Sequence, residues 1–101
     1  MIRSQAECQD LFYQKVCADN RISPTHISLY FALVHEAGLL FGIPFFLRRS
    51  VVAQLSKIYS PVTMNRCLKE LHDYRYIGYR PSFKPRETMV EMLILDREEN
   101  I

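Results

Sequence analysis

Residues 45–91, FFLRRSVVAQLSKIYSPVTMNRCLKELHDYRYIGYRPSFKPRETMVE, decide the fold of this chain. The aromatic run Phe45-Phe46-Leu47 predicts a brief strand, and residues 49–56 predict a helix with Val51, Val52 and Leu55 inward. Lys57-Ile58-Tyr59 predicts a tight turn with a buried isoleucine. Ser60-Pro61 then opens a second helix to about Asp73, because serine suits the N-cap and proline suits the first helical position.

Two predicted strands close the stretch. Residues 76–80 and 89–95 flank a segment, 81–87, whose two prolines and polar residues predict a loop. Strand, helix, turn, helix and hairpin in this order are the plan of a winged helix-turn-helix. In that plan one helix lies in a DNA groove while the hairpin touches the flanking backbone. We therefore expect an α+β, mostly helical chain: a three-helix core plus a β-hairpin wing, with an extra N-terminal helix.

The remaining residues predict two helices before this stretch. The first covers 4–18 and begins with a capping box from Ser4 to Glu7. The second begins at Ser23-Pro24 and is ended by Gly42 and Pro44. The long apolar run that contains it is interrupted by His35-Glu36, so a buried helix fits better than a membrane span. The length suits a single domain over 1–101, with a winged-helix core at 23–95 and a frayed acidic tail at 96–101.

Positive charge is concentrated in the fold-deciding stretch. Residues 1–44 carry a net charge of −1, from three Lys or Arg and four acids, and residues 91–101 carry −3, from one and four. Residues 45–90 carry nine Lys or Arg against three acids, a net charge of +6. A segregated basic block is typical of a surface that binds a polyanion, and the alternative is a solvated basic face.

On a helical wheel of residues 60–73, Met64, Cys67, Leu68 and Leu71 face the core. The outward residues Thr63, Asn65 and Arg66 are near the helix start, so we expect them to contact DNA bases. Lys69 lies further along and is expected to contact phosphate. The alternative is that any surface helix shows polar residues outward.

Further phosphate contacts are expected at the start of the preceding helix and in the hairpin. Ser60 has capping as its competing role, and Arg48 and Arg49 could instead solubilise the end of a buried strand. At the loop tip, Phe83 either packs beneath the wing, which we favour, or is presented to a partner. The expected phosphate contacts are Arg48, Arg49, Ser50, Ser60, Lys69, Arg80, Ser82, Lys84 and Arg86.

The sequence offers no catalytic or metal site. Its three cysteines form no CxxC pair, its three histidines have no ligand spacing, and three glycines leave little for a phosphate-binding loop. We therefore expect no enzyme activity, no cofactor, no metal and no small-molecule effector. The odd cysteine count and the lack of an export signal in residues 1–10 predict reduced thiols in the cytoplasm.

Several strings carry a family resemblance: ISPTHISLYFAL at 22–33, AQLSKIYSPVTMNRCLKELHDYRYIGYRPS at 53–82, and the ending TMVEMLIL. Over about residues 20–95 the chain resembles the small winged-helix proteins of bacterial mobile and conjugative elements, which are described as transcriptional regulators or DNA-binding proteins. The resemblance implies a recognition helix at Ser60–Asp73 and a wing at Pro81–Thr88. Arg48 departs from the serine expected before the third helix, which would leave that helix without a side-chain cap. The wing FKPRET differs from an Asn/Gly-rich one.

Two functions follow as hypotheses. The first is a sequence-specific protein that binds double-stranded DNA, as a transcriptional regulator or accessory factor of a mobile element. It would bind as a homodimer, because one small module offers limited interface. The dimer contact would lie on the N-terminal helix at Leu11, Phe12 and Tyr13, if these residues are exposed. The second is a winged-helix module for protein–protein interaction in a replication or DNA-transfer complex.

Overall fold

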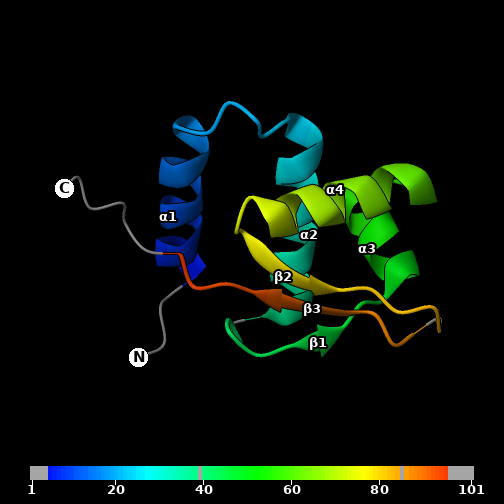
Figure 1. The fold of residues 1–101 in the computed structure, drawn as a ribbon. Helices are drawn as coiled ribbons and strands as arrows, with labels where there is room; N and C mark the ends of the chain where they lie inside the picture. The colour runs from blue at the N-terminus through cyan, green and yellow to red at the C-terminus, as the bar shows by residue number, and fades with distance from the viewer. Residues whose placement is uncertain (1–4, 39, 85, 96–101) are drawn as a thin grey trace.

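The computed structural model describes residues 5–38, 40–84 and 86–95. Within these residues the chain is α+β, with four helices and one three-stranded antiparallel sheet (Figure 1). Helical residues make up about half of the described chain, a smaller share than the mostly helical fold that was predicted. The elements in chain order are α1 (Gln5–Cys17), α2 (Pro24–Ala37), β1 (Phe45–Phe46), α3 (Arg49–Ser56), α4 (Pro61–Asp73), β2 (Ile77–Arg80) and β3 (Met89–Met92).

Helix α2 begins where its sequence predicts and ends earlier. The hydroxyl oxygen of Ser23 accepts a hydrogen bond from the backbone N–H of His26, and the ring Nδ1 of His26 accepts one from the backbone N–H of Ser23 at 2.9 Å. The helix ends at Ala37, not at Gly42, because Gly38 takes a positive φ of 62° that does not continue a helix. None of the described helices is long and apolar enough to cross a membrane.

The α3–turn–α4 segment matches the prediction in its bounds. Helix α3 covers Arg49–Ser56, and α4 begins after the N-cap Ser60. The turn is made by Lys57, whose φ is 64°, and by Ile58, which is buried. The expected inward face of α3 is partly wrong: Val52 is fully buried, whereas Leu55 is 43% exposed. On α4 all four expected core residues are buried.

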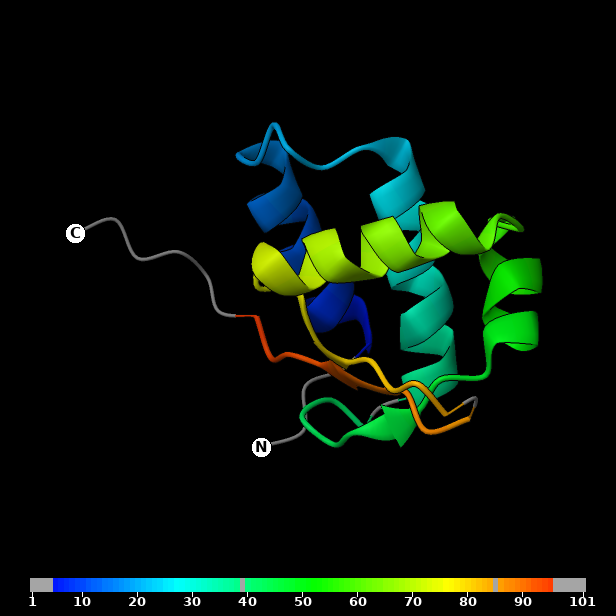
Figure 2. The ribbon, with the colours of Figure 1, turned by 45° about the vertical axis from the view of Figure 1, so that its right-hand side comes forward.

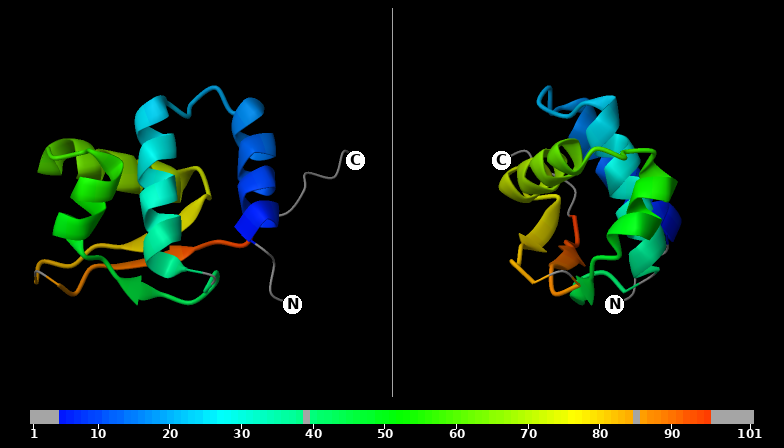
Figure 3. Two further views of the ribbon diagram at one scale, coloured as in Figure 1. Left: turned by 180° about the vertical axis from the view of Figure 1, so that it is seen from behind. Right: turned by 90° about the vertical axis from the view of Figure 1, so that its right-hand side faces the viewer.

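The sheet has β3 at its centre. β3 pairs with β2 through Tyr79 opposite Val90, and with β1 through Phe45 opposite Val90. Both hairpin strands are shorter than predicted, and the pairing of β1 with β3 is not evident from the sequence. Helices α2, α3 and α4 lie on one side of the sheet (Figure 3). Accordingly Val90 and Met92 are buried, whereas Met89 and Glu91 alternate with them and are half-buried.

Helix α1 is joined to the rest of the chain by aromatic packing. The ring of Phe12 stacks on Tyr30 with centroids 3.8 Å apart and meets Tyr76 edge-on at 5.6 Å. Lys15 Nζ donates to the carbonyl oxygens of Tyr74 and Arg75, at 3.3 and 3.0 Å. The predicted capping residue Ser4 lies outside the described residues.

The predicted dimer contact on α1 is corrected by this packing. Leu11 is 8% exposed and Phe12 is 0% exposed, because both contribute to the hydrophobic core of a single chain. The condition of exposure is met by Tyr13 alone, at 48%. Leu11 and Phe12 therefore cannot form an apolar surface for a second copy while the core is intact.

Candidate nucleic-acid interface

Three separate segments of the chain meet at one end of the molecule. The start of α3, the start of α4 and the β2–β3 loop gather there in two views (Figures 1 and 2). They line a solvent-exposed groove with a volume of about 890 Å³. We call it the α3–α4–loop groove. Its described lining residues are Phe46, Leu47, Arg48, Arg49, Ser50, Val51, Pro61, Asn65, Ser82, Phe83, Arg86 and Thr88.

The groove is basic and partly apolar. Three of its described lining residues are arginines, Arg48, Arg49 and Arg86, and none of the described lining residues is an acid. Exposed aromatic surface is added by Phe46, at 58%, and by Phe83. Such a lining attracts anions and also offers apolar faces for stacking.

Half of the expected nucleic-acid contacts lie in this groove. The structure brings together Arg48, Arg49, Ser50, Asn65, Ser82 and Arg86. The other expected contacts, Ser60, Thr63, Arg66, Lys69, Arg80 and Lys84, are not lining residues. Arg80 instead borders a separate hollow of about 150 Å³ beside His72 and Glu91.

The three expected base contacts on α4 do not share one edge of the helix. Successive residues are about 100° apart around an α-helix, which places Thr63 and Asn65 about 160° apart. Asn65 borders the groove, whereas Thr63 is half-buried on the opposite edge. Arg66 lies between them and its Nε is 3.8 Å from Glu70 Oε1. Among the three, only Asn65 thus shares a surface with the loop.

Two expected phosphate contacts on α4 have other partners within the fold. The hydroxyl oxygen of Ser60 accepts a hydrogen bond from the backbone N–H of Thr63 at 3.3 Å, so Ser60 is a helix cap. Lys69 Nζ lies 3.2 Å from Asp73 Oδ2, one turn further along the helix. The Lys69–Asp73 pair is exposed and can be exchanged for phosphate at little cost.

Arg48 is held by a carboxylate. Its Nε and Nη2 donate to the two carboxylate oxygens of Glu36, each at 2.8 Å, and this contact raises the pKa of the guanidinium. The side chain of Glu36 is 7% exposed. Arg48 also precedes α3 without making a side-chain capping bond, as its departure from the expected serine predicted. Among the described lining residues, the cations without an ion pair of this kind are Arg49 and Arg86.

The β2–β3 loop is shaped by hydrogen bonds among its own residues. The backbone N–H of Ser82 donates to Thr88 Oγ1 at 3.3 Å, and the backbone N–H of Lys84 donates to Ser82 Oγ at 3.1 Å. Ser82 therefore stabilises the conformation of the loop. Arg86 has a backbone φ of 77°, which residues other than glycine rarely adopt. This conformation costs roughly 1–3 kcal/mol of strain.

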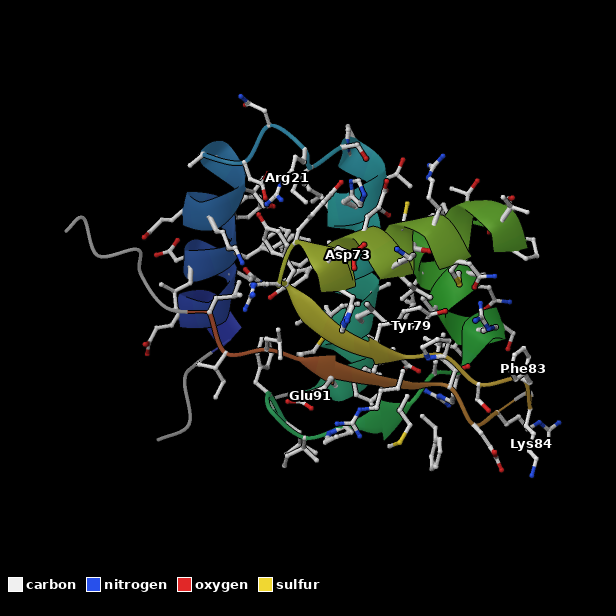
Figure 4. All side chains as sticks on the ribbon, in the orientation of Figure 1. Arg21, Asp73, Tyr79, Phe83, Lys84 and Glu91 are labelled. Carbon is white, nitrogen blue, oxygen red and sulfur yellow. The ribbon has the colours of Figure 1, made fainter. Side chains whose placement is uncertain are left out.

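The favoured position of Phe83, packed beneath the wing, is wrong. Its side chain is fully exposed, at 108% of the reference value, and stands at the loop tip beside Lys84 (Figure 4). Phe46 was not expected at the site either. Its exposure follows from strand alternation, because Phe45 faces the core opposite Val90 and Phe46 must face away.

A polar cluster inside the fold also went unpredicted. His26 Nε2 lies 2.8 Å from Glu70 Oε1, and Cys67 Sγ lies within 4.8 Å of the His26 ring and of the Glu70 carboxylate. The backbone N–H of Ser23 donates to His26 Nδ1, so in the neutral ring the proton is on Nε2 and points to Glu70. The nitrogen that faces Cys67 and Glu70 is therefore a donor, which explains the cluster as a helix-capping network and does not favour a metal ion.

Comparison with known proteins finds no matching family model, no matching curated protein and no matching solved structure. A function for this chain is therefore inferred from its own residues and geometry.

Proposed function

We propose that this chain is a winged helix-turn-helix protein that binds double-stranded DNA, with α4 as the recognition helix and the β2–β3 loop as the wing. The role that fits best is a transcriptional regulator or an accessory factor of a mobile element. The observation that supports the proposal is the α3–α4–loop groove. It joins the starts of two helices and the loop on one basic surface whose described lining residues include no acid.

The physical argument begins with phosphate. A helix start presents backbone N–H groups that favour anions, and here Arg49 lies in the first turn of α3. Arg86 supplies a second cation from the loop across the groove. Two cations on separate elements can contact phosphates that lie apart along a duplex, which positions the protein without reading sequence.

Sequence reading is assigned chiefly to Asn65. It lies on the second turn of α4, is exposed, and borders the same groove as Arg49 and Arg86. An asparagine amide can bond both edge atoms of an adenine in the major groove. Arg66 is exposed on the neighbouring part of α4 and could bond a guanine after leaving Glu70, since a pair 3.8 Å apart is weak.

A binding-site selection from random duplex at two salt concentrations tests the proposal. We expect an enriched sequence and an affinity that falls steeply with salt. Asn65→Ala or Arg66→Ala should relax the preference at one position, and Lys84→Ala should weaken all duplexes equally. No salt-dependent binding to any duplex would contradict the proposal.

A second candidate is a protein-interaction module of a replication or DNA-transfer complex. The exposed rings of Phe83 and Phe46 favour it, because they line the same groove and exposed apolar side chains that gather in one place are typical of a surface that binds another protein. This candidate predicts little or no binding to duplex DNA at low salt.

A further inference from the structure

Phe83 lies at the tip of the β2–β3 loop, outside the hydrophobic core. Its ring is fully exposed, so it contributes no burial to stability. Ser82, which precedes it, nevertheless accepts a hydrogen bond from the backbone N–H of Lys84 and donates its own backbone N–H to Thr88, which holds this part of the loop. A held loop that presents a bare aromatic ring lowers the entropy cost of stacking that ring on a ligand.

The surroundings of Phe83 indicate which ligand. The same groove contains a second exposed ring, Phe46, and the cations Arg49 and Arg86, with no acid among its described lining residues. An apolar peptide would use the rings and leave the arginines unpaired, whereas free phosphate would use the arginines alone. An unpaired nucleotide uses both, because its base has an open face and its phosphate is anionic. Paired bases inside a duplex offer no such face.

We propose that the α3–α4–loop groove takes an unpaired nucleotide next to a bound duplex, with the base stacked on Phe83 and the phosphate on Arg49 or Arg86. The ligand is then a duplex end or fork that carries a short single strand, not a continuous duplex. This inference rests on the proposed duplex binding and goes beyond it, since nothing in duplex recognition requires an aromatic loop tip.

The test compares two DNAs by fluorescence anisotropy with the full chain. One is a blunt duplex, and the other is the same duplex with a three-nucleotide single strand at one end. We expect the overhang to raise affinity about tenfold, the contribution of one stacked base. Phe83→Ala and Phe83→Leu should both remove this preference, because leucine is apolar and has no planar ring. The matched control is Tyr13→Ala, an exposed aromatic residue outside the groove, which should keep the preference.

A direct readout is available because the chain contains no tryptophan. In a Phe83→Trp variant the single indole should be quenched by the overhang DNA and much less by the blunt duplex. Thermal unfolding should show that the Phe83 variants are as stable as the parent chain, since the side chain is exposed.

The outcomes separate this inference from the proposed function. Equal affinity of the parent chain for both DNAs would overturn the inference and leave duplex binding intact. An equal loss on both DNAs from Phe83→Ala would do the same, because the ring would then contact the duplex. If the chain bound neither DNA, both proposals would fall.

Discussion

Arg48 and Glu36 form a bidentate ion pair, in which Nε and Nη2 of the arginine each donate to one carboxylate oxygen at 2.8 Å. The pair joins the last turns of α2 to the residue that precedes α3. The carboxylate side chain is 7% exposed and the guanidinium side chain is 66% exposed, so the arginine covers a buried acid. Two adjacent arginines that look equivalent in sequence therefore have different contacts in the fold.

Arg48→Ala should lower the stability of the fold, whereas Arg49→Ala should weaken DNA binding. Arg48→Ala should lower the melting temperature by a few degrees, because it removes both hydrogen bonds to the Glu36 carboxylate and opens that carboxylate to water. Arg49→Ala should leave the melting temperature unchanged and weaken DNA binding, with a salt slope smaller by about 0.9. Thermal unfolding and salt-titrated anisotropy measure the two effects. Equal melting temperatures for both variants would contradict the assignment.

Phe12→Ala should destabilise a single chain. Removing a fully buried ring that stacks on Tyr30 should cost about 3–5 kcal/mol of the free energy of unfolding. Tyr13→Ala, its half-exposed neighbour, should cost much less. Urea denaturation at several protein concentrations checks this. If Phe12→Ala instead left stability intact and weakened self-association, the buried position of Phe12 would be wrong for the protein in solution.

Asp19 should make the fold sensitive to acid. The Arg21 guanidinium, bonded at 2.7 Å, lowers the pKa of this carboxyl from 3.8 to about 2, and the hydroxyl of Tyr76 donates to it as well. A lowered pKa in the folded chain means that the stabilisation is complete above about pH 4 and is lost as the pH falls towards 2. Because Arg21 is exposed, we expect only roughly 1–2 kcal/mol from this carboxylate.

Asp19→Asn should therefore lower stability at pH 7 and remove part of the loss between pH 4 and 2. Urea denaturation of both proteins across that range measures it. The control is Asp73→Asn, whose carboxylate is 48% exposed and faces Lys69. If the free energy of unfolding fell equally between pH 4 and 2 for the parent chain and for Asp19→Asn, the assignment would be contradicted.

Arg75→Gly should stabilise the chain. Helix α4 ends in a Schellman motif, in which the backbone N–H of Tyr76 donates to the carbonyl of Leu71 at 2.9 Å and that of Arg75 to His72 at 3.1 Å. The motif requires Arg75 to adopt a φ of 69°, which suits glycine better than arginine. The contact from Lys15 is made to the Arg75 backbone and survives the change.

We expect a gain of about 0.5–1 kcal/mol, measured as a rise of a few degrees in melting temperature. Arg80→Gly is the matched control, because this arginine lies in the extended strand β2, where glycine should destabilise. A loss of stability from both variants would show that the side chain of Arg75 matters more than its backbone conformation.

The sequence alone determined the features that depend on neighbouring residues. The pairs Ser23-Pro24 and Ser60-Pro61 start helices because a serine oxygen reaches a backbone N–H three residues away, and both partners of that bond are close in the sequence. The turn at Ile58 and the core face of α4 follow from spacing in the same way.

Tertiary structure decided everything that depends on contacts between distant segments. Nothing local to Phe45-Phe46 indicates that this strand pairs with β3, since the pairing joins residues more than forty positions apart. Likewise, nothing near Arg48 in the sequence indicates that it forms an ion pair with Glu36. Asn65 and Phe83 line one groove only because the folded chain brings their elements together. Local hydrogen bonds are encoded by adjacent residues, whereas the membership of a surface depends on how whole elements pack.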